Sequence, residues 1–305
     1  MVSTSSSSLP SELVIVGAAG RLGAALVKRY SEDHTVRGLT RDDLDLSDPE
    51  SVRRALEPLD YDRLILPGGL TAVDYCEDHE DEAFAVNANG PRLVAEISAA
   101  KGAHLTYIST DFVFDGCCSK ACHESLKARP LSVYGASKLE GEENVLGVSD
   151  RNLVARLSWL FGAGKPAFPE WIIQQAMKHD DLSLPEEKTS SPSYSEDVVG
   201  YLALLLSLDD GGPPAGGIYH LSNSGQCTWR EWGQFCLDEA AAAGLPIQTR
   251  RMGANCLEDI AAFVAKRPIN SVLDTSKFTQ FAGFVPRPWQ EAMRDHFART
   301  LGAEV

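Results

Sequence analysis

Short apolar runs alternate with amphipathic stretches along this chain, and the alternation restricts the fold more than any other feature of the sequence. Runs typical of buried strands occupy residues 13–16, 35–39, 63–66, 105–108 and 153–157. Between them lie stretches with helical periodicity, among them 21–30, 49–56, 81–100 and 137–146. Strands that alternate with helices form a parallel sheet with helices on both faces. The sequence therefore predicts an α/β fold with a doubly wound parallel sheet.

The pattern loosens after about residue 162, where prolines and a short strand at 218–221 accompany one long helix at 229–243. We expect a disordered serine-rich leader (1–11) and a dinucleotide-binding domain (12–161 plus about 189–222). A smaller C-terminal lobe (162–188 plus 223–305) would bind the substrate. A doubly wound sheet binds its ligand beyond the carboxyl ends of its strands, so this lobe would close over the ligand there.

Charge and cysteine content narrow the function and the compartment. The 305 residues carry a net charge of −15 without a basic block, which argues against nucleic acids and anionic membrane surfaces as partners. No apolar run approaches the ~18–20 residues that span a bilayer. The seven cysteines form no regular framework and the start lacks a secretory pattern, so we expect free thiols in a cytoplasmic protein. Cys117, Cys118, Cys122 and His123 lack the spaced pairs of a zinc site, and an exposed thiol loop is the expectation.

A glycine-rich turn follows the first predicted strand. Gly17 permits the tight turn, Gly20 allows a pyrophosphate to approach the backbone, and Gly23 lets the helix pack against the strand. The amides at the start of the helix would then face the phosphates. A generic glycine-rich turn is the alternative, but the position between an apolar strand and an amphipathic helix favours a dinucleotide.

The end of the second predicted strand bears on the choice between the two dinucleotides. An acidic residue there favours a free 2′-hydroxyl, whereas a nearby arginine favours a 2′-phosphate. The chain has Thr40 and Arg41 at this place, so NADP(H) is preferred and NAD(H) is possible. If Arg41 is only a solvated surface residue, the preference is left open.

Tyr134 and Lys138 lie one helical turn apart, so their side chains share a face of the predicted helix. An ammonium beside a phenol, together with the charge of an oxidised nicotinamide, lowers the pKa of the phenol and suits it to proton transfer. A solvated surface pair is the alternative. Thr110 follows the predicted strand at 105–108, where its hydroxyl could stabilise a developing oxyanion or merely close the strand end.

Three further residues allow two interpretations each. Trp159 either packs between the lobes or provides a stacking platform for a sugar or base. Lys188 and Arg267 are candidate diphosphate contacts on grounds of charge, or solvated surface residues.

Taken in order, these motifs resemble a short-chain dehydrogenase/reductase of the extended type, and more closely the dTDP-4-dehydrorhamnose reductase family. The resemblance covers nearly the whole chain after Glu12, including segments 109–116, 133–139, 156–162 and 266–271. It implies a catalytic triad of Thr110, Tyr134 and Lys138. The cofactor contacts that it implies are Gly20, Arg21, Leu22, Thr40, Asp45, Leu46, Gly69, Leu70 and Thr71. For the substrate it implies Asp111 and Trp159, beside which we place Phe112 and Lys188.

The reaction implied is NAD(P)H-dependent reduction of the 4-keto group of a dTDP-6-deoxyhexulose. Related 4,6-dehydratases have Thr-Asp-Glu at the segment where this chain has Thr110-Asp111-Phe112. The glutamate that would act as the acid in elimination of water is therefore absent. The chain departs from the usual family pattern at segment 66–70, which would lie beside the nicotinamide ribose. It also departs at Phe112, where relatives usually have a tyrosine, and at segment 186–193. These last two departures would affect the sugar and nucleotide pocket, which puts the particular sugar in question. A non-catalytic NADP-binding subunit, similar to the regulatory β subunit of methionine adenosyltransferase, and a reductase or epimerase of another nucleotide sugar remain alternatives. The resemblance is also compatible with a homodimer.

Overall fold

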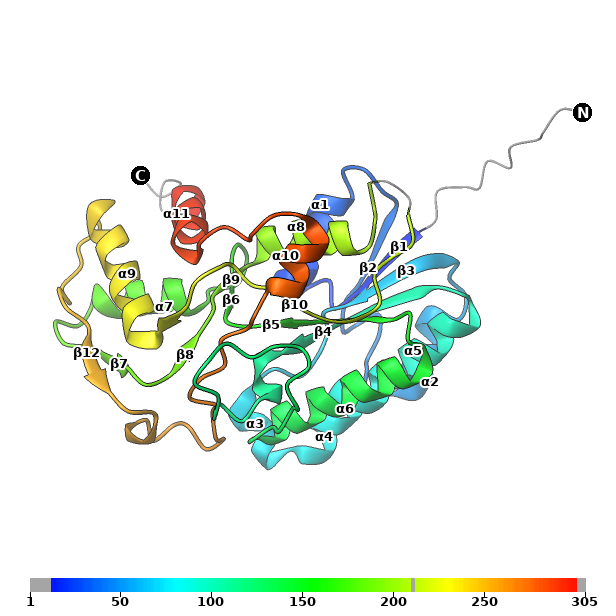
Figure 1. Ribbon diagram of the computed structural model, residues 1–305, viewed down its shortest axis with the longest axis horizontal. Coiled ribbons are helices and arrows are strands. Elements are labelled where there is room, and N and C mark those ends of the chain that lie inside the picture. The colour runs from blue at the N-terminus through cyan, green and yellow to red at the C-terminus, as the bar shows by residue number, and fades with distance from the viewer. Residues whose placement is uncertain (1–11, 210–211, 301–305) are drawn as a thin grey trace, which may run out of the picture.

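The computed structural model describes residues 12–209 and 212–300, so the predicted leader lies outside the described residues (Figure 1). Its main element is a six-stranded sheet with the order β2-β1-β3-β4-β5-β10, in which all neighbouring strands are parallel. The strands are β1 (Glu12–Val16), β2 (Val36–Leu39), β3 (Tyr61–Leu66), β4 (His104–Thr110), β5 (Leu153–Leu157) and β10 (Gly217–His220). The predicted fold class is confirmed.

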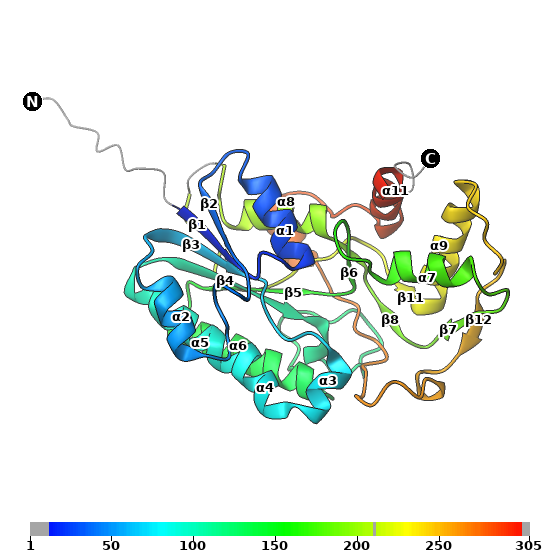
Figure 2. The same ribbon diagram turned by 180° about the vertical axis from the view of Figure 1, so that it is seen from behind.

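Helices cover both faces of this sheet (Figures 1 and 2). Alternate residues of a strand point to opposite faces, so Leu13 and Ile15 join one core while Val14 and Val16 join the other. The first core is closed by α1 (Arg21–Tyr30), α8 (Ser195–Leu205) and α10 (Ser276–Ala282). The second is closed by α2 (Pro49–Leu56), α5 (Gly90–Ala100) and α6 (Val133–Val148).

The segment predicted as one helix over 81–100 is divided in the structure. It contains the end of α4 (Glu80–Phe84), a π-helical turn (Ala85–Asn89) and α5, and the short α3 (Val73–Asp78) precedes α4. The turn is anchored through Asn87, whose side chain bonds the backbone N–H and C=O of Leu70, each at 2.9 Å. These tertiary contacts, which helical periodicity does not encode, account for the interruption.

A smaller lobe has its own core between α7 (Phe168–Ala176), α9 (Trp229–Ala242) and α11 (Trp289–Thr300). Trp232 is buried at its centre, as expected for the helix that begins at Trp229. Three two-stranded pairs complete the lobe and its junction with the sheet: β6 (Leu160–Phe161) with β9 (Ser193–Tyr194), β7 (Ser183–Pro185) with β12 (Gly253–Asn255), and β8 (Thr189–Ser190) with β11 (Cys227–Thr228).

The domain boundaries drawn from the sequence stay a prediction. Phe278 of α10 packs in a core of the sheet, although its number falls in the range expected for the smaller lobe. No helix within the described residues is long and apolar enough to cross a membrane.

Candidate active site

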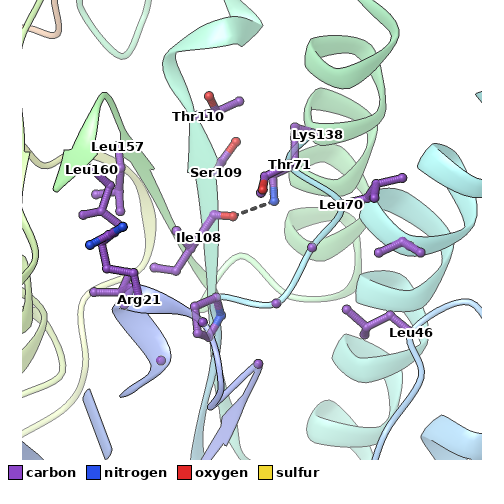
Figure 3. Close-up of a pocket in the computed structure, with 18 of the residues that line it drawn as sticks. Arg21, Leu46, Leu70, Thr71, Ile108, Ser109, Thr110, Lys138, Leu157 and Leu160 are labelled. Atoms are coloured by element: carbon purple, nitrogen blue, oxygen red, sulfur yellow. Dashed lines mark hydrogen bonds between the residues drawn. The ribbon is translucent and has the colours of Figure 1, made fainter. Parts of the chain in front are cut away.

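Strand order reverses at the boundary between β1 and β3, and a doubly wound sheet binds ligands at such a point. A cavity of about 660 Å³ opens there, within the usual range of ~300–1,000 Å³ for ligand pockets. It is lined from the β1–α1 turn, the ends of β2 to β5 and the start of α6 (Figure 3). The candidate site residues named from the sequence line this cavity, with the exception of Lys188 and Arg267.

The glycine turn is built so that two backbone segments meet. Gly17 has a φ of +99°, and a Cβ on it would lie 2.6 Å from the backbone of Gly68, so side chains are excluded on two grounds. A Cβ on Gly23 would lie 2.1 Å from the carbonyl oxygen of Gly17, which explains the close approach of α1 to the turn. The first residues of α1 line the cavity, and the amides at a helix N-terminus suit a pyrophosphate.

Arg21, the first residue of α1, crosses the cavity mouth. Its guanidinium donates to the carbonyl oxygens of Gly162 and Lys165, and more weakly to that of Ala163 at 3.4 Å. In Figure 3 its side chain extends toward Leu160. Arg21 therefore connects the glycine turn to the loop that leads into the smaller lobe.

The residues after β2 form the rim of the same cavity. Thr40 donates from its amide and hydroxyl to Asp43, at 2.9 and 2.8 Å. Arg41 has a side chain that is 73% exposed, and it lies 3.9 Å from both Asp45 and Glu82. The guanidinium is thus at the rim with only loose partners, so it is free to reorient toward an added phosphate.

Tyr134 and Lys138 come from the first turns of α6. The helix begins at Val133, because the Ser132 side chain accepts a hydrogen bond from the Gly135 amide at 3.2 Å. Tyr134 is 8% exposed, and its ring meets Phe112 edge-on at 5.6 Å. The Lys138 Nζ donates to the carbonyl oxygen of Ile108 at 2.7 Å, the bond drawn in Figure 3.

Burial sets the protonation of this pair in the absence of a ligand. It raises the pKa of the Tyr134 phenol above its ordinary value, while a hydrogen bond with the Thr110 hydroxyl opposes the rise. It also lowers the pKa of Lys138 to about 7, against the attraction of Glu142. Tyr134 is therefore protonated at neutral pH and can act as a proton donor.

Thr110 ends β4 with its hydroxyl beside both Tyr134 and Asp111. The Thr110 Oγ1 donates to the Asp111 Oδ1 at 3.2 Å and accepts from the Phe112 amide at the same distance. Asp111 also lines the cavity, although it is only 2% exposed. The structure thus brings the three predicted triad residues together.

The family is decided by a comparison with known protein families. A model described as the RmlD substrate binding domain matches residues 11–301.

The chain belongs to this family.

The resemblance indicated by the motifs is therefore confirmed. A dTDP-4-dehydrorhamnose reductase of Mycolicibacterium smegmatis is 33% identical over 295 residues, which cover 95% of this chain and 86% of that protein. A Streptomyces antibioticus protein named "Probable dTDP-4,6-dihydroxy-2-methyloxan-3-one 4-ketoreductase" is 32% identical over 298 residues, covering 95% and 96%. The crystal structure of a dTDP-4-dehydrorhamnose reductase from Bacillus anthracis, in complex with NADP, matches with a TM-score of 0.87 at 28% identity, covering 96% and 100%.

Trp159 of this RmlD family member packs between the lobes, and its role as a stacking platform for a sugar or base stays a prediction. One face of its ring stacks on Trp232 at 5.2 Å with an interplanar angle of 5°, so it packs against the core of the smaller lobe. The residue also lines the cavity, and its φ of +43° is a strained conformation for a tryptophan. Such strain is retained where the surrounding structure holds a side chain in place, here at the junction of the lobes.

The solvated interpretation of Lys188 and Arg267 is wrong. Lys188 is fully buried, with its Nζ 5.6 and 5.9 Å from the ring centroids of Phe112 and Trp159, behind the cavity wall. The Arg267 side chain is 8% exposed and its guanidinium is paired with Asp74, whose carboxylate it contacts at 3.1 and 2.5 Å. Arg267 therefore holds a late loop against α3 and does not line the cavity.

Sequence reasoning missed a buried ion pair between α6 and β5. Arg156 and Glu142 are 3% and 1% exposed, and two hydrogen bonds of 2.9 and 2.5 Å join them. Glu142 also accepts from Ser109 and lies one turn beyond Lys138, whose charge it stabilises. An arginine inside an otherwise apolar strand was the available signal, because a buried charge needs a partner.

The cysteine loop differs from its expectation. Cys117 is exposed, but Cys122 is buried with Val113, Phe114 and Leu273, because its backbone forms a bridge with Leu273. The prediction of an exposed thiol loop is thus wrong for Cys122. Within the part of the chain that the structure describes, no group of three or more His, Cys, Asp or Glu side chains is arranged to hold a metal ion.

Proposed function

We propose that this protein is an NADPH-dependent reductase that acts on the 4-keto group of a dTDP-linked 6-deoxysugar. The observation that carries the proposal is that Thr110, Tyr134 and Lys138 line the same cavity as the glycine turn. The names of the relatives support the substrate class, and the NADP in the Bacillus anthracis structure supports the cofactor.

The residues present fit a dinucleotide. The amides at the start of α1 would hold the pyrophosphate. Gly17 and Gly68 meet there without side chains, so the pyrophosphate could approach the backbone closely. Arg41 would contact a 2′-phosphate from the rim, and Lys138 would bond the nicotinamide ribose. When bound, the nicotinamide supplies the hydride for the carbonyl carbon.

The chain's own residues then handle the oxygen and its proton. Tyr134 donates its phenolic proton to the oxygen on which negative charge develops, and Thr110 donates a hydrogen bond to the same oxygen. The Lys138 ammonium stabilises the phenolate that is left. Trp159 and Phe112 would flank the sugar, and Asp111 would position Thr110. Phe112 carries no carboxyl group, which argues for reduction over elimination of water.

A second candidate is reduction of a different dTDP-linked keto-deoxysugar. The Streptomyces antibioticus relative, whose name describes a 4-ketoreductase of another dTDP-linked sugar, favours this candidate.

The proposal is tested by mixing the purified protein with NADPH and a panel of dTDP-, UDP- and GDP-linked 4-keto sugars. We expect loss of the reduced-nicotinamide absorbance with a dTDP-linked 4-keto-6-deoxysugar, and none without sugar. A non-catalytic NADP-binding subunit would bind NADPH but oxidise it with no member of the panel, and that result would contradict the proposal.

A further inference from the structure

Asp111 lies at the centre of a buried hydroxyl network. Its Oδ2 accepts from Ser158 at 3.0 Å, from Ser190 at 3.2 Å and from Ser271, while its Oδ1 accepts from Thr110 at 3.2 Å. These donors come from the ends of β4 and β5, from β8 and from the segment before α10. Both carboxylate oxygens are therefore bonded inside the protein.

Lys188 supplies a positive charge to this network. Its side chain is fully buried, and its Nζ donates to the Ser271 Oγ at 2.7 Å. Ser271 in turn donates to Asp111, so a continuous path of hydrogen bonds joins the ammonium to the carboxylate. Burial lowers the pKa of Lys188 to about 8, and Asp111 opposes this effect. A buried carboxylate needs such compensation to remain ionised.

The hydroxyl of Thr110 has one proton and more than one acceptor. In the structure it donates to Asp111, yet the proposed reaction needs it to donate to the substrate oxygen beside Tyr134. The strength with which Asp111 holds this proton depends on how much of the carboxylate charge is neutralised elsewhere, since hydrogen bonds to charged acceptors are the stronger ones. Lys188 and the three serines provide that neutralisation on the opposite carboxylate oxygen.

We propose that Lys188 is a positioning residue of the reductase: through Ser271 it withdraws charge from Asp111 and so frees the Thr110 hydroxyl for the reacting oxygen. Lys188 does not touch the substrate, because it lies behind the rings of Phe112 and Trp159. The inference rests on the proposed function and adds a residue that determines how readily the Thr110 hydroxyl donates to the substrate oxygen.

The test is a double-mutant cycle on turnover. Lys188→Gln in the otherwise unaltered protein should lower kcat about tenfold, equivalent to ~1.4 kcal/mol, while the KM for NADPH stays within about twofold. In a Thr110→Val background, whose residual turnover is measured first, Lys188→Gln should change kcat less than about twofold, because the hydroxyl through which Lys188 acts is gone. Lys127→Gln, which removes an exposed lysine, serves as the matched control and should leave kcat unchanged.

Lys188→Arg distinguishes loss of the positive charge from loss of the folded structure. This variant keeps a cation in place and should recover most of the turnover lost in Lys188→Gln, and thermal unfolding of each variant shows whether it is folded. An equal loss in both backgrounds, no loss in either, or an arginine variant as slow as the glutamine variant would overturn the inference. Turnover by the unaltered protein decides the proposed function separately, since the inference is judged only from the ratios between variants.

Discussion

Replacing Lys138 with methionine should make the protein more stable at pH 6 while removing the ammonium that the proposed reaction requires. Lys138 is 4% exposed, and burial lowers its pKa to about 7 from an ordinary value of 10.5. A tenfold change in proton affinity corresponds to ~1.4 kcal/mol, so burial of the charged Lys138 side chain lowers the free energy of unfolding by about 5 kcal/mol. Loss of the hydrogen bond to Ile108 and of the contact between Nζ and the Tyr107 ring, 3.9 Å from its centroid, offsets ~2 kcal/mol of the gain.

The remaining ~3 kcal/mol corresponds to a rise of about 5 °C in Tm for a chain of this size. The sign depends on pH. In the unfolded chain the lysine is protonated up to about pH 10.5, whereas in the fold it releases its proton above about pH 7. Between these values the unfolded state binds more protons, so this group's contribution to stability rises with pH. The advantage of methionine is therefore full below pH 7 and declines as the pH rises toward 10.5.

Thermal unfolding of both proteins at pH 6, 7.5 and 9, followed by circular dichroism, measures this difference. Lys188 titrates in both proteins, so its contribution cancels in the comparison. A lower Tm of the methionine variant at pH 6, or a difference that does not change with pH, would refute the reasoning that burial of the ammonium costs stability.

Two further predictions concern the cofactor end of the cavity. Arg41→Ala should weaken NADPH binding about tenfold in a fluorescence titration and leave NADH binding unchanged, because only the 2′-phosphate would meet this side chain; equal weakening of both would contradict the assignment. Gly17→Ala should lower the free energy of unfolding in urea by more than about 2 kcal/mol, since its φ is +99° and its Cβ would meet Gly68 at 2.6 Å. Gly147→Ala, at an open helical position, is the control and should be neutral or stabilising; similar losses in both would argue against the tight turn.

Features that depend on local periodicity could be predicted from the sequence. The stretches at 21–30 and 49–56 form α1 and α2 with the predicted bounds. Apolar periodicity indicates α6 only from residue 137, whereas the Tyr134–Lys138 spacing requires a start near Tyr134; in the structure the Ser132 cap sets the start at Val133. The glycine turn and the Tyr134–Lys138 spacing located the cavity, since both place chemistry at the carboxyl edge of a parallel sheet.

The buried polar network could not be predicted in this way. Lysine is usually exposed, and nothing near Lys188 in the sequence indicates that Ser271 and Asp111 will enclose its ammonium. Its burial follows from packing between three distant segments, which composition and spacing do not report. Arg156 did carry a signal, because it interrupts an apolar strand, but its partner Glu142 becomes evident only when α6 is packed on β5.

The central claim is that the Tyr134 phenol protonates the substrate oxygen as hydride arrives. Steady-state turnover of Tyr134→Phe with NADPH and the dTDP-linked 4-keto-6-deoxysugar, measured beside NADPH affinity, tests it most directly. The account predicts a fall in kcat of about a hundredfold or more, with the Kd for NADPH within about twofold of the unaltered protein. A phenylalanine variant that turns over at the original rate would contradict it.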